Sequence, residues 1–272
     1  FENFKNLNTQ VENSILPKKP KMILTSIENH YNDFFKLYCL KKKNDGAKLI
    51  IFQHGGNFFT GENPMYNYQD VEISDKFLTW GLSPKPNKTI PLFVSTVLKK
   101  KINKNLLNKG IIVSHFNPWQ YPGSYDSLPR YYSDLISYNK RIFDFISNIE
   151  RKILLSSSIK VKQEGSIRYE NFFPINFIKK NFPKINLLSG GDPIWKISKK
   201  YKIVVETLNS TGFLEAMYLN IPIILLIDRK IDRLNVESEE HYKDLEKVNI
   251  LHYDSEKAAK FVNSIYNDPS KW

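Results

Sequence analysis

The chain has 272 residues, of which 41% are hydrophobic, 25% charged and 14% aromatic, and these values exclude disordered, collagen-like and coiled-coil proteins. The length favours two domains over one. Lysine and arginine number 40 against 28 aspartates and glutamates, and the resulting net charge of +12 permits a nucleic acid, an anionic lipid or a phosphorylated substrate as partner without selecting among them.

Cysteine content and apolar run length narrow the class further. The single Cys39 cannot form an internal disulfide, which suits a reducing compartment, so we expect a cytoplasmic protein. The longest apolar runs, such as residues 221–227, are far shorter than the ~20 residues that a membrane-spanning helix needs. We therefore expect no transmembrane segment.

The first part of the chain shows a strand, a helix and a second strand. A polar stretch at 1–20 reads as a lead-in, and the periodicity then predicts a strand at 22–27, a helix at 31–40 and a strand at 47–52.

Irregular sequence follows that second strand. Residues 57–80 show no regular pattern, and residues 82–88, with two prolines, read as a crossing between domains. We therefore expect an amino-terminal domain over 1–83 and a carboxyl-terminal domain over 84–272.

The second part alternates strands and helices more fully. Its strands are continuous runs of Ile, Val and Leu, which is typical of a parallel sheet covered on both faces and predicts a doubly wound α/β domain. The expected strands are 110–115, 152–157, 185–189, 202–206, 222–227 and 249–253, and the expected helices are 135–150, 173–181, 211–219, 237–247 and 255–267. Ligands of such sheets bind beyond the carboxyl ends of the strands, so the loops that follow strands are the candidate sites.

One candidate loop follows the second strand and reads Gln53-His54-Gly55-Gly56. Paired glycines let the backbone approach a ligand closely, and an imidazole beside them can act as a base near neutral pH. The alternative is a glycine turn with an incidental histidine.

A carboxylate that orients His54 could come from the loop after the first strand. Asp33 lies there, close to His30 and Asn32, and we expect it to serve if the two strands are neighbours. A helix N-cap formed by Asn32 or Asp33 is the alternative.

A further candidate loop joins Glu206 to the helix expected at 211–219. Ser210, Thr211 and Gly212 open that helix, whose amino-terminal N–H groups and positive dipole end can hold a phosphate, and Glu206 and Glu215 flank the loop. An ordinary N-cap by Ser210 or Thr211 is the alternative. Neither GxxxxGK[ST] nor GxGxxG occurs, which disfavours a P-loop ATPase and a dinucleotide-dependent dehydrogenase.

A third candidate loop holds Ser156 and Ser157, which would follow a strand that ends at Leu155 and contact a donor phosphate or ribose. A solvated Ser/Lys loop is the alternative. The five histidines are scattered without an HExxH pattern, so we expect no metal site, and the absence of GxSxG disfavours a nucleophile-elbow hydrolase.

Several blocks of the sequence resemble a bacterial group of surface-polysaccharide transferases with the GT-B fold. The blocks occur in the order of the family, from about residue 20 to the end, at 23–36, 46–56, 73–81, 205–222, 248–252 and 258–266. The resemblance implies two Rossmann-like domains, the carboxyl-terminal one binding a nucleotide-activated sugar donor and the amino-terminal one the acceptor, with no bound metal or cofactor. The family pattern has more amino-terminal strands than the two expected here, so we expect that domain to be incomplete.

The resemblance also implies roles for individual residues. Kdo and sialic-acid transferases have a Ser/Thr pair before a helix that contacts the donor phosphate, and Ser210 and Thr211 occupy that place. Glycerophosphate transferases of teichoic acid synthesis have a His-Gly after a strand that serves as base, which corresponds to His54. Glu206 stands where the family often carries Asp.

Together these observations predict a glycosyltransferase that acts on a polysaccharide or lipid-linked acceptor, with His54 as base and Ser210 and Thr211 at the leaving phosphate. Its positive charge would favour a peripheral position at the anionic inner face of the membrane. Transfer of a glycerophosphate unit is the alternative within enzymes. A basic nucleic-acid-binding protein is the alternative outside them, although no such motif occurs and the lysines are spread along the chain.

Overall fold

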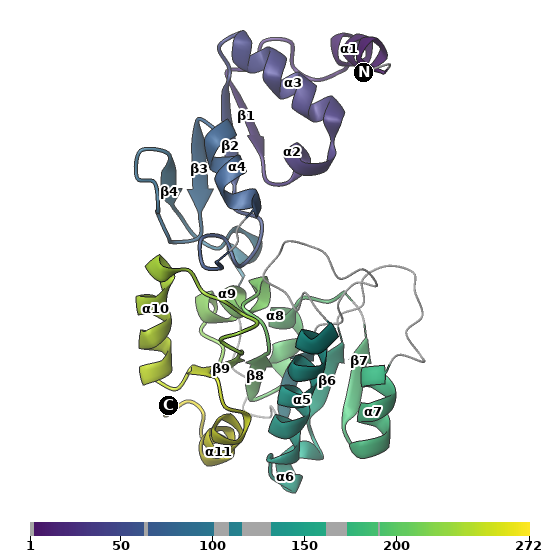
Figure 1. The fold of residues 1–272 in the computed structure, drawn as a ribbon, viewed down its shortest axis with the longest axis vertical. Coiled ribbons are helices and arrows are strands. Elements are labelled where there is room, and N and C mark those ends of the chain that lie inside the picture. The colour runs from purple at the N-terminus through teal and green to yellow at the C-terminus, as the bar shows by residue number, and fades with distance from the viewer. Residues whose placement is uncertain (1–2, 63–64, 101–108, 116–131, 162–172, 190) are drawn as a thin grey trace. The chain divides into compact units, whose positions relative to one another are not determined.

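The structure is a computed structural model that describes residues 3–62, 65–100, 109–115, 132–161, 173–189 and 191–272 (Figure 1). The chain divides into two compact units, the first made of Phe1–Phe59 and Met65–Thr96 and the second of Thr60–Pro64 and Val97–Trp272. Each unit is built on its own parallel sheet.

The first unit contains a four-stranded parallel sheet in the order β1-β2-β3-β4. Its strands are β1 (Met22–Thr25), β2 (Lys48–Phe52), β3 (Lys76–Thr79) and β4 (Thr89–Pro91), and its helices are α1 (Phe4–Glu12), α2 (Glu28–Tyr31), α3 (Asp33–Asn44) and α4 (Met65–Ile73). Alternate strand residues, among them Ile23, Ile51 and Phe77, are buried against Leu37 of α3 and Val71 of α4. The period-two burial of β1 and β3 is that of a sheet with one packed face.

Four elements of this unit lie wholly outside the strands and helices expected from the sequence. They are α1, α4, β3 and β4. The lead-in is a packed helix because Val11 is buried and α1 lies on α3. The expectation failed at α4 because its nine residues carry aromatic and polar side chains without a clear apolar stripe, and at β3 and β4 because they are only four and three residues long. Since β4 pairs with β3, the first unit continues to Thr96, beyond the expected boundary at residue 83.

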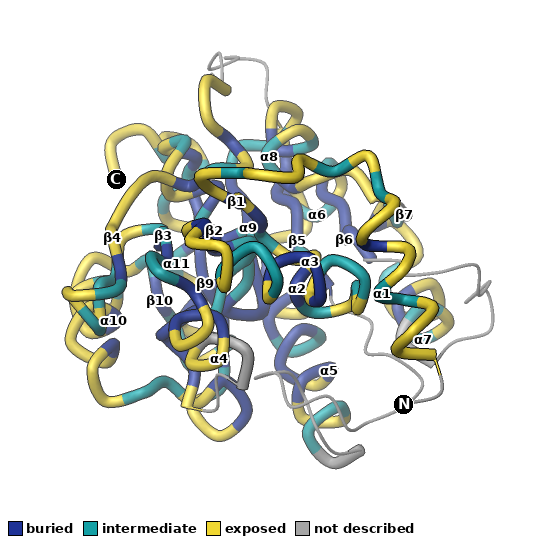
Figure 2. Tube along the Cα trace, turned by 90° about the horizontal axis from the view of Figure 1, so that it is seen from above, coloured by how far each residue is buried: buried dark blue, intermediate teal, exposed yellow. Residues whose placement is uncertain are grey.

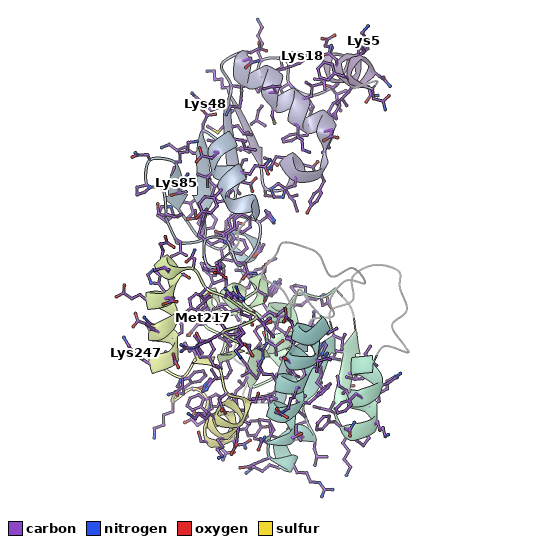
Figure 3. The ribbon with its side chains drawn as sticks, viewed as in Figure 1. Lys5, Lys18, Lys48, Lys85, Met217 and Lys247 are labelled. Carbon is purple, nitrogen blue, oxygen red and sulfur yellow. The ribbon has the colours of Figure 1, made fainter. Side chains whose placement is uncertain are left out.

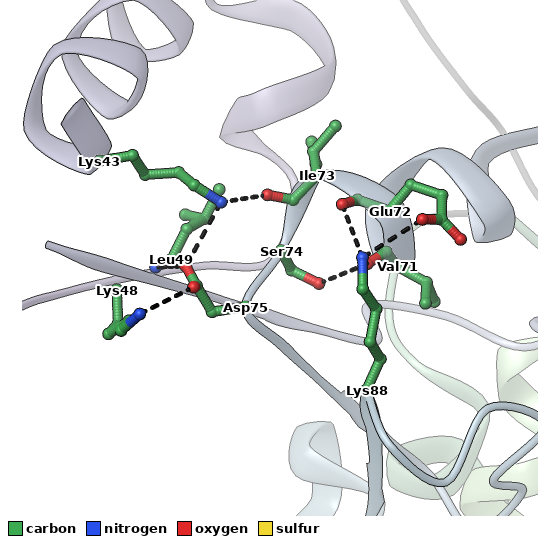
Figure 4. Close-up of polar contacts among 9 residues, drawn as sticks. All are labelled: Lys43, Lys48, Leu49, Val71, Glu72, Ile73, Ser74, Asp75 and Lys88. Carbon is green, nitrogen blue, oxygen red and sulfur yellow. Dashed lines mark hydrogen bonds and ion pairs between the residues drawn. The ribbon is translucent and has the colours of Figure 1, made fainter. Parts of the chain in front are cut away.

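Ion pairs at Asp75 fix the amino ends of β2 and β3 (Figure 4). The Asp75 carboxylate accepts the Leu49 N–H at 2.9 Å and lies 3.3 Å from the ammonium groups of Lys43 and Lys48. Burial opposes ionisation, but these donors outweigh it and hold the pKa of Asp75 below its usual value. These contacts occupy the amino ends of β2 and β3, so we expect a ligand site of this sheet at the opposite, carboxyl ends of the strands.

The second unit contains a six-stranded parallel sheet in the order β10-β9-β8-β5-β6-β7. Its strands are β5 (Ile111–His115), β6 (Ser158–Val161), β7 (Asn186–Ser189), β8 (Ile203–Glu206), β9 (Ile223–Leu226) and β10 (Leu251–His252). Its helices are α5 (Tyr132–Ser147), α6 (Arg151–Leu154), α7 (Phe173–Asn181), α8 (Ile194–Ile197), α9 (Thr211–Tyr218), α10 (Val236–Lys247) and α11 (Ser255–Ile265), with a 3-10 turn at Ser198–Lys200. A further 3-10 turn, Ser95–Val97, covers the point in the sequence where the first unit ends and the second begins.

This strand order is the doubly wound order 3-2-1-4-5-6 when the strands are numbered within the unit. Helices α5 and α11 contribute to the core on one face, and α8, α9 and α10 to the core on the other, so the central strands are buried throughout (Figure 2). The order reverses between β5 and β8, whose pairing joins Val113 to Val205. Ligands of open α/β sheets bind at the carboxyl ends of the strands at such a switch point.

The strand expected at 152–157 is wrong. Residues Arg151–Leu154 form the short helix α6, and the strand begins only at Ser158. The Ser157 hydroxyl donates to the Ile153 carbonyl at 2.7 Å and accepts from the Ile111 N–H at 3.0 Å, which closes the turn between α6 and β6. Ser156 and Ser157 therefore precede β6 and lie at the amino ends of the strands, opposite to the edge at which we expected them to contact a ligand.

Gly110 makes this turn possible, which gives a first prediction. Its φ is +68°, and a Cβ there would lie 1.9 Å from the Ser156 carbonyl oxygen. We expect Gly110→Ala to lower the free energy of unfolding by at least about 3 kcal/mol, measured by chemical denaturation, because backbone strain is joined by overlap with a carbonyl. Gly46→Ala is the control, since Gly46 has φ +95° but nothing within 4 Å of its Cβ, and it should cost only about 1 kcal/mol. Equal losses in both variants would contradict the close approach.

Candidate functional site

A buried polar row crosses three strands at the carboxyl end of the second sheet. Lys160 of β6 is the register partner of Ser114 of β5, and Ser114 follows the paired residues Val113 and Val205, so it is level with Glu206 of β8. Aligned residues of neighbouring parallel strands point to the same face. Lys160 and Glu206 are both buried, which is unusual for charged side chains unless they are paired.

Glu206 is the most perturbed acid of this row. Burial raises its pKa to about 7, the hydrogen bond with Ser114, the charge of Lys160 and the hydrogen bond with Ser210 act in the opposite direction, and the charge of Glu215 adds to the rise. A carboxyl group with such a pKa exchanges its proton near neutral pH, which is typical of functional sites but also occurs in structural networks.

The start of α9 lies directly against Glu206. Ser210 holds the N-cap position but makes no capping hydrogen bond with its side chain, and its hydroxyl instead donates to Glu206 Oε2 at 3.3 Å. A Cβ on Gly212 would lie 2.7 Å from Glu206 Oε1 and 3.0 Å from Ile194 Cγ2, so this position has no room for a side chain. The N-cap alternative for Ser210 is therefore not realised.

Further polar groups, from α5 and from the loops after β8 and β9, surround the switch point. Thr207 donates from its hydroxyl to the Ser114 carbonyl at 2.6 Å, and its Oγ1 lies 2.6 Å from the Tyr138 hydroxyl oxygen. Arg141 donates to the Thr207 carbonyl at 3.1 Å and lies 3.7 Å from a carboxylate oxygen of Asp232. Burial raises the pKa of Asp232 to about 6, although the charge of Arg141 opposes the rise. These contacts hold the carboxyl ends of β5, β8 and β9 in place.

Sequence reasoning missed this part of the site. His115 ends β5, is 1% exposed, and lies 2.8 Å from Asn139 Oδ1 through Nε2. Its burial lowers its pKa to about 4, so it is neutral at physiological pH. The available signal was the pair Asn139 and Arg141, two polar residues on the buried face of a helix whose other buried residues are apolar.

The candidate site of the first unit lies at the carboxyl end of β2. Gln53 is buried, donates to the Gly55 carbonyl at 2.8 Å, and accepts the Trp80 N–H at 2.8 Å, so it ties the loop after β2 to the loop after β3. The ring of His54 packs edge-on against Phe58, with 4.9 Å between centroids, and against His30, with 5.3 Å between centroids. Gln53 and Gly55 thus hold a turn that presents His54 beside a second imidazole. The backbone of Asn57 and Phe59 in the same loop is left-handed, with φ of +66° and +61°, a conformation rare for a phenylalanine.

The carboxylate beside these histidines is Asp70 and not Asp33. Asp33 is exposed and pairs with Lys36 at 2.8 Å, while Asn32 accepts the Phe35 N–H and caps α3, which was the alternative for this segment. Asp70, from α4, is fully buried, and both of its oxygens lie 2.9 Å from His30 Nε2. The expectation for Asp33 failed because it relied on nearness in the sequence, whereas the contact comes from a helix 40 residues away.

In the described ranges, no group of three or more His, Cys, Asp and Glu side chains could hold a metal ion. No helix within the same ranges is long and apolar enough to cross a membrane.

Solved structures with similar folds include sugar-nucleotide enzymes. The proposed UDP-N-acetylglucosamine 2-epimerase of Listeria monocytogenes matches with a TM-score of 0.59 and 12% identity over 97% of this chain and 70% of that one. A S. aureus MnaA–UDP co-structure matches with a TM-score of 0.55 and 14% identity over 99% of this chain and 73% of that one. Both have the GT-B fold, so the two Rossmann-like units are of the GT-B type, as the sequence predicted.

The family of the chain follows from its whole length. Residues 1–272 match the model of the LIC12162 family of transferases, and the chain belongs to this family. No curated protein sequence matches it.

The burial of Glu206 predicts a pH-dependent stability. Its pKa of about 7 in the folded protein exceeds the ordinary value of 4.5 for a glutamate in an unfolded chain. Between pH 4.5 and about 7, Glu206 still holds its proton in the folded protein but has lost it in the unfolded chain. Raising the pH through this range therefore removes a proton from the folded state only, which lowers its stability. The free energy of unfolding of the wild type, relative to Glu206→Gln, should fall between pH 4.5 and 7 by a few kcal/mol. Chemical denaturation of both proteins at pH 5 and pH 8 measures this.

The control is Glu256→Gln, a replacement of an exposed carboxylate paired with Lys260. It should leave the pH dependence unchanged. A constant difference between the wild type and Glu206→Gln at the two pH values would mean that Glu206 is not desolvated.

Proposed function

We propose that this transferase moves a sugar from a nucleotide-activated donor to a hydroxyl group of a surface-polysaccharide or lipid-linked acceptor. The observation that carries the proposal is the arrangement at α9. Ser210 does not cap the helix with its side chain, Gly212 admits close approach, and the acid beneath them has a raised pKa. Membership of a transferase family and the fold likeness to a protein solved with UDP support it.

The donor phosphate would bind at the amino end of α9. Negative charge on the phosphate oxygens grows as the bond to the anomeric carbon breaks, and the N–H groups and dipole of the first helical turn stabilise that charge. Ser210 and Thr211 supply hydroxyl donors at the same place. Glu206 favours this binding when it is protonated, because a neutral carboxyl group does not repel the phosphate.

The remaining donor-side residues take different places in the proposal. Glu215 is buried on α9 and contributes through the charge that it exerts on Glu206. Ser156 and Ser157 have no part, since they lie at the amino ends of the strands. The proposed step uses protein groups to stabilise the phosphate charge, so we expect transfer to continue in the presence of EDTA.

The acceptor would be activated by His54. In the proposed step the imidazole takes the proton of the acceptor hydroxyl, the acceptor oxygen forms a bond to the anomeric carbon, and the bond from that carbon to the donor phosphate oxygen breaks, which releases the nucleotide. His30 packs against the ring of His54, and Asp70 in turn holds the His30 imidazole. Gly55 and Gly56 keep the turn narrow enough for an acceptor to approach.

The location of the acceptor is a further part of the proposal. The net charge of +12 favours a peripheral position at an anionic lipid surface. The lysines labelled in Figure 3 come from several elements, such as Lys5 of α1, Lys48 of β2 and Lys247 of α10, and some pair with carboxylates, as Lys247 does with Asp244. Sedimentation with vesicles should show binding to anionic but not to neutral lipid, and equal binding to both would exclude electrostatic attachment.

Two sets of variants test the division of labour between the units. We expect His54→Ala to lower kcat by 10²-fold or more with donor affinity retained, because it removes only the base. Ser210→Ala combined with Thr211→Ala should weaken donor binding about tenfold or more, because two hydroxyl donors to a charged group are lost. Sugar release from a panel of nucleotide sugars and isothermal titration with their nucleotides measure the two effects.

Asp33→Asn is the control, because the exposed Asp33 pairs only with Lys36 among its described contacts and should leave both constants unchanged. If His54→Ala weakened donor binding and the hydroxyl variant lowered only kcat, the roles of the two loops would be exchanged. If no nucleotide sugar were turned over by the wild type with any acceptor preparation, the proposed function would be wrong.

A further inference from the structure

A short segment of the chain belongs to a different unit from the residues on either side of it. Residues Thr60–Pro64 follow the His54 loop and precede α4, both of which belong to the first unit, yet they cluster with the second unit. Gly61 forms an antiparallel bridge with Leu234, and the Glu62 N–H donates to the Arg233 carbonyl at 2.9 Å. Within the second unit, this crossing segment therefore lies along the loop between β9 and α10.

Thr60 is the most firmly held residue of the crossing segment. Its carbonyl accepts the Asn235 N–H at 2.9 Å and the Ser238 hydroxyl at 3.1 Å. Its own hydroxyl accepts from Asn209 Nδ2 at 3.0 Å. Thr60 is 8% exposed and Ser238 is fully buried, so water does not compete strongly for these bonds.

Asn209 joins this segment to the candidate donor loop. It directly precedes Ser210, is 5% exposed, and accepts the Tyr242 hydroxyl at 2.7 Å on its Oδ1 while its Nδ2 donates to Thr60. Both ends of its amide group are therefore fixed. A displacement of the Ser210 loop must either carry Thr60 with it or break the Asn209 to Thr60 hydrogen bond.

The chain also connects Thr60 to His54. Residues 55–59 join them along the chain, and this stretch contains the left-handed residues Asn57 and Phe59. Phe58 and Phe59 are buried against Phe77, which limits how far the path can give. Because this stretch is short and packed, we expect a displacement of Thr60 to displace the turn that holds His54 as well.

We propose that Thr60 is a positioning residue that links the donor loop to the base: through its hydrogen bond to Asn209, occupation of the Ser210 loop by a nucleotide restricts the His54 loop. This rests on the proposed function, because it assumes that the nucleotide binds at Ser210. Linkage makes the effect reciprocal, so a restricted His54 loop also favours the bound nucleotide.

Hydrogen exchange of the full chain tests the link. The probe is whichever of CMP, CDP, UDP and GDP raises the melting temperature most, and exchange is followed in peptides covering 53–60 and 205–215. In the wild type we expect the nucleotide to slow exchange in both segments. In Thr60→Val, which keeps the side-chain shape but removes the hydroxyl, slowing should persist at 205–215 and disappear at 53–60. Thr60→Ser, which keeps the hydroxyl, should restore it.

The turnover rate is a second measurement. A purely structural role of Thr60 would not change kcat and the donor KM in the pattern expected here. Thr60→Val should lower kcat about tenfold with the donor KM unchanged, because the base is displaced while the donor loop is intact. Tyr242→Phe removes the donor that fixes the Asn209 carbonyl and should show the same pattern to a smaller degree, which keeps the proposal testable if Thr60→Val does not fold.

The outcomes separate this proposal from the proposed function. Equal slowing at 53–60 in the wild type and in Thr60→Val would overturn the link while leaving the donor site in place. Slowing at 205–215 alone in the wild type would overturn it as well. If no nucleotide slowed exchange at 205–215 in the wild type, the donor site itself would be wrong, and the link with it.

Discussion

The pairing of β5 with β8 is the constraint on which the candidate donor site depends. It joins the two halves of the second sheet at the point where the strand order reverses, and it sets Ser114 and Glu206 side by side at the carboxyl edge. Because helices cover both faces, Glu206 is only 4% exposed, and its charge must be offset by neighbouring groups or removed by a proton. The same burial that makes the strand stable thus makes its last residue titrate near neutral pH.

The burial of Glu206 also determines which group the hydroxyl of Ser210 binds. A serine before a helix normally caps the first turn, but here the buried acid competes for its hydroxyl. Gly212 allows the helix to approach the acid closely enough for this competition. The first turn of α9 therefore lies against a carboxyl group whose pKa burial raises to about 7, and an anion that approaches the helix meets less repulsion when this group is protonated.

The first unit uses its sheet in a comparable way with different residues. Asp75 and its lysines fix the amino ends of β2 and β3, while Gln53 joins the loops that follow the same strands at the carboxyl ends. His54 is thus held on a loop whose two sides are both anchored. His30 and Phe58 pack against its ring, and Asp70 holds the His30 imidazole in place.

Much of this architecture is readable from the sequence, for a physical reason. Parallel strands buried on both faces must be apolar at successive positions, and the runs at 110–115, 202–206 and 222–227 fall on β5, β8 and β9. The run at 152–157 also contains consecutive apolar residues, but its first part belongs to α6, because a short apolar run does not distinguish strand from helix and the turn at Gly110 and Ser157 decides.

Contacts between distant segments were not readable in this way. Asp70 lies in a stretch without periodicity, so no local sequence pattern predicted its contact with His30. Asp33 is close to His30 in the sequence, but its carboxylate pairs with Lys36 instead. Arg141 and Asn139 are polar residues on a buried helix face, a signal that only the position of α5 over the switch point explains. Sequence pattern located the loops at 53–56 and 206–212, and tertiary packing supplied their partners.

The measurement that tests the account most directly is a crystal structure of the chain with a bound nucleotide, or with an intact nucleotide sugar and the His54→Ala variant. The account predicts phosphate density at the amino end of α9, within hydrogen-bond distance of Ser210 and Thr211. Density at the charged pocket formed by Arg229, Asp232, Arg233 and Tyr253 near α10, or at the amino ends of the strands near Ser157, would contradict it.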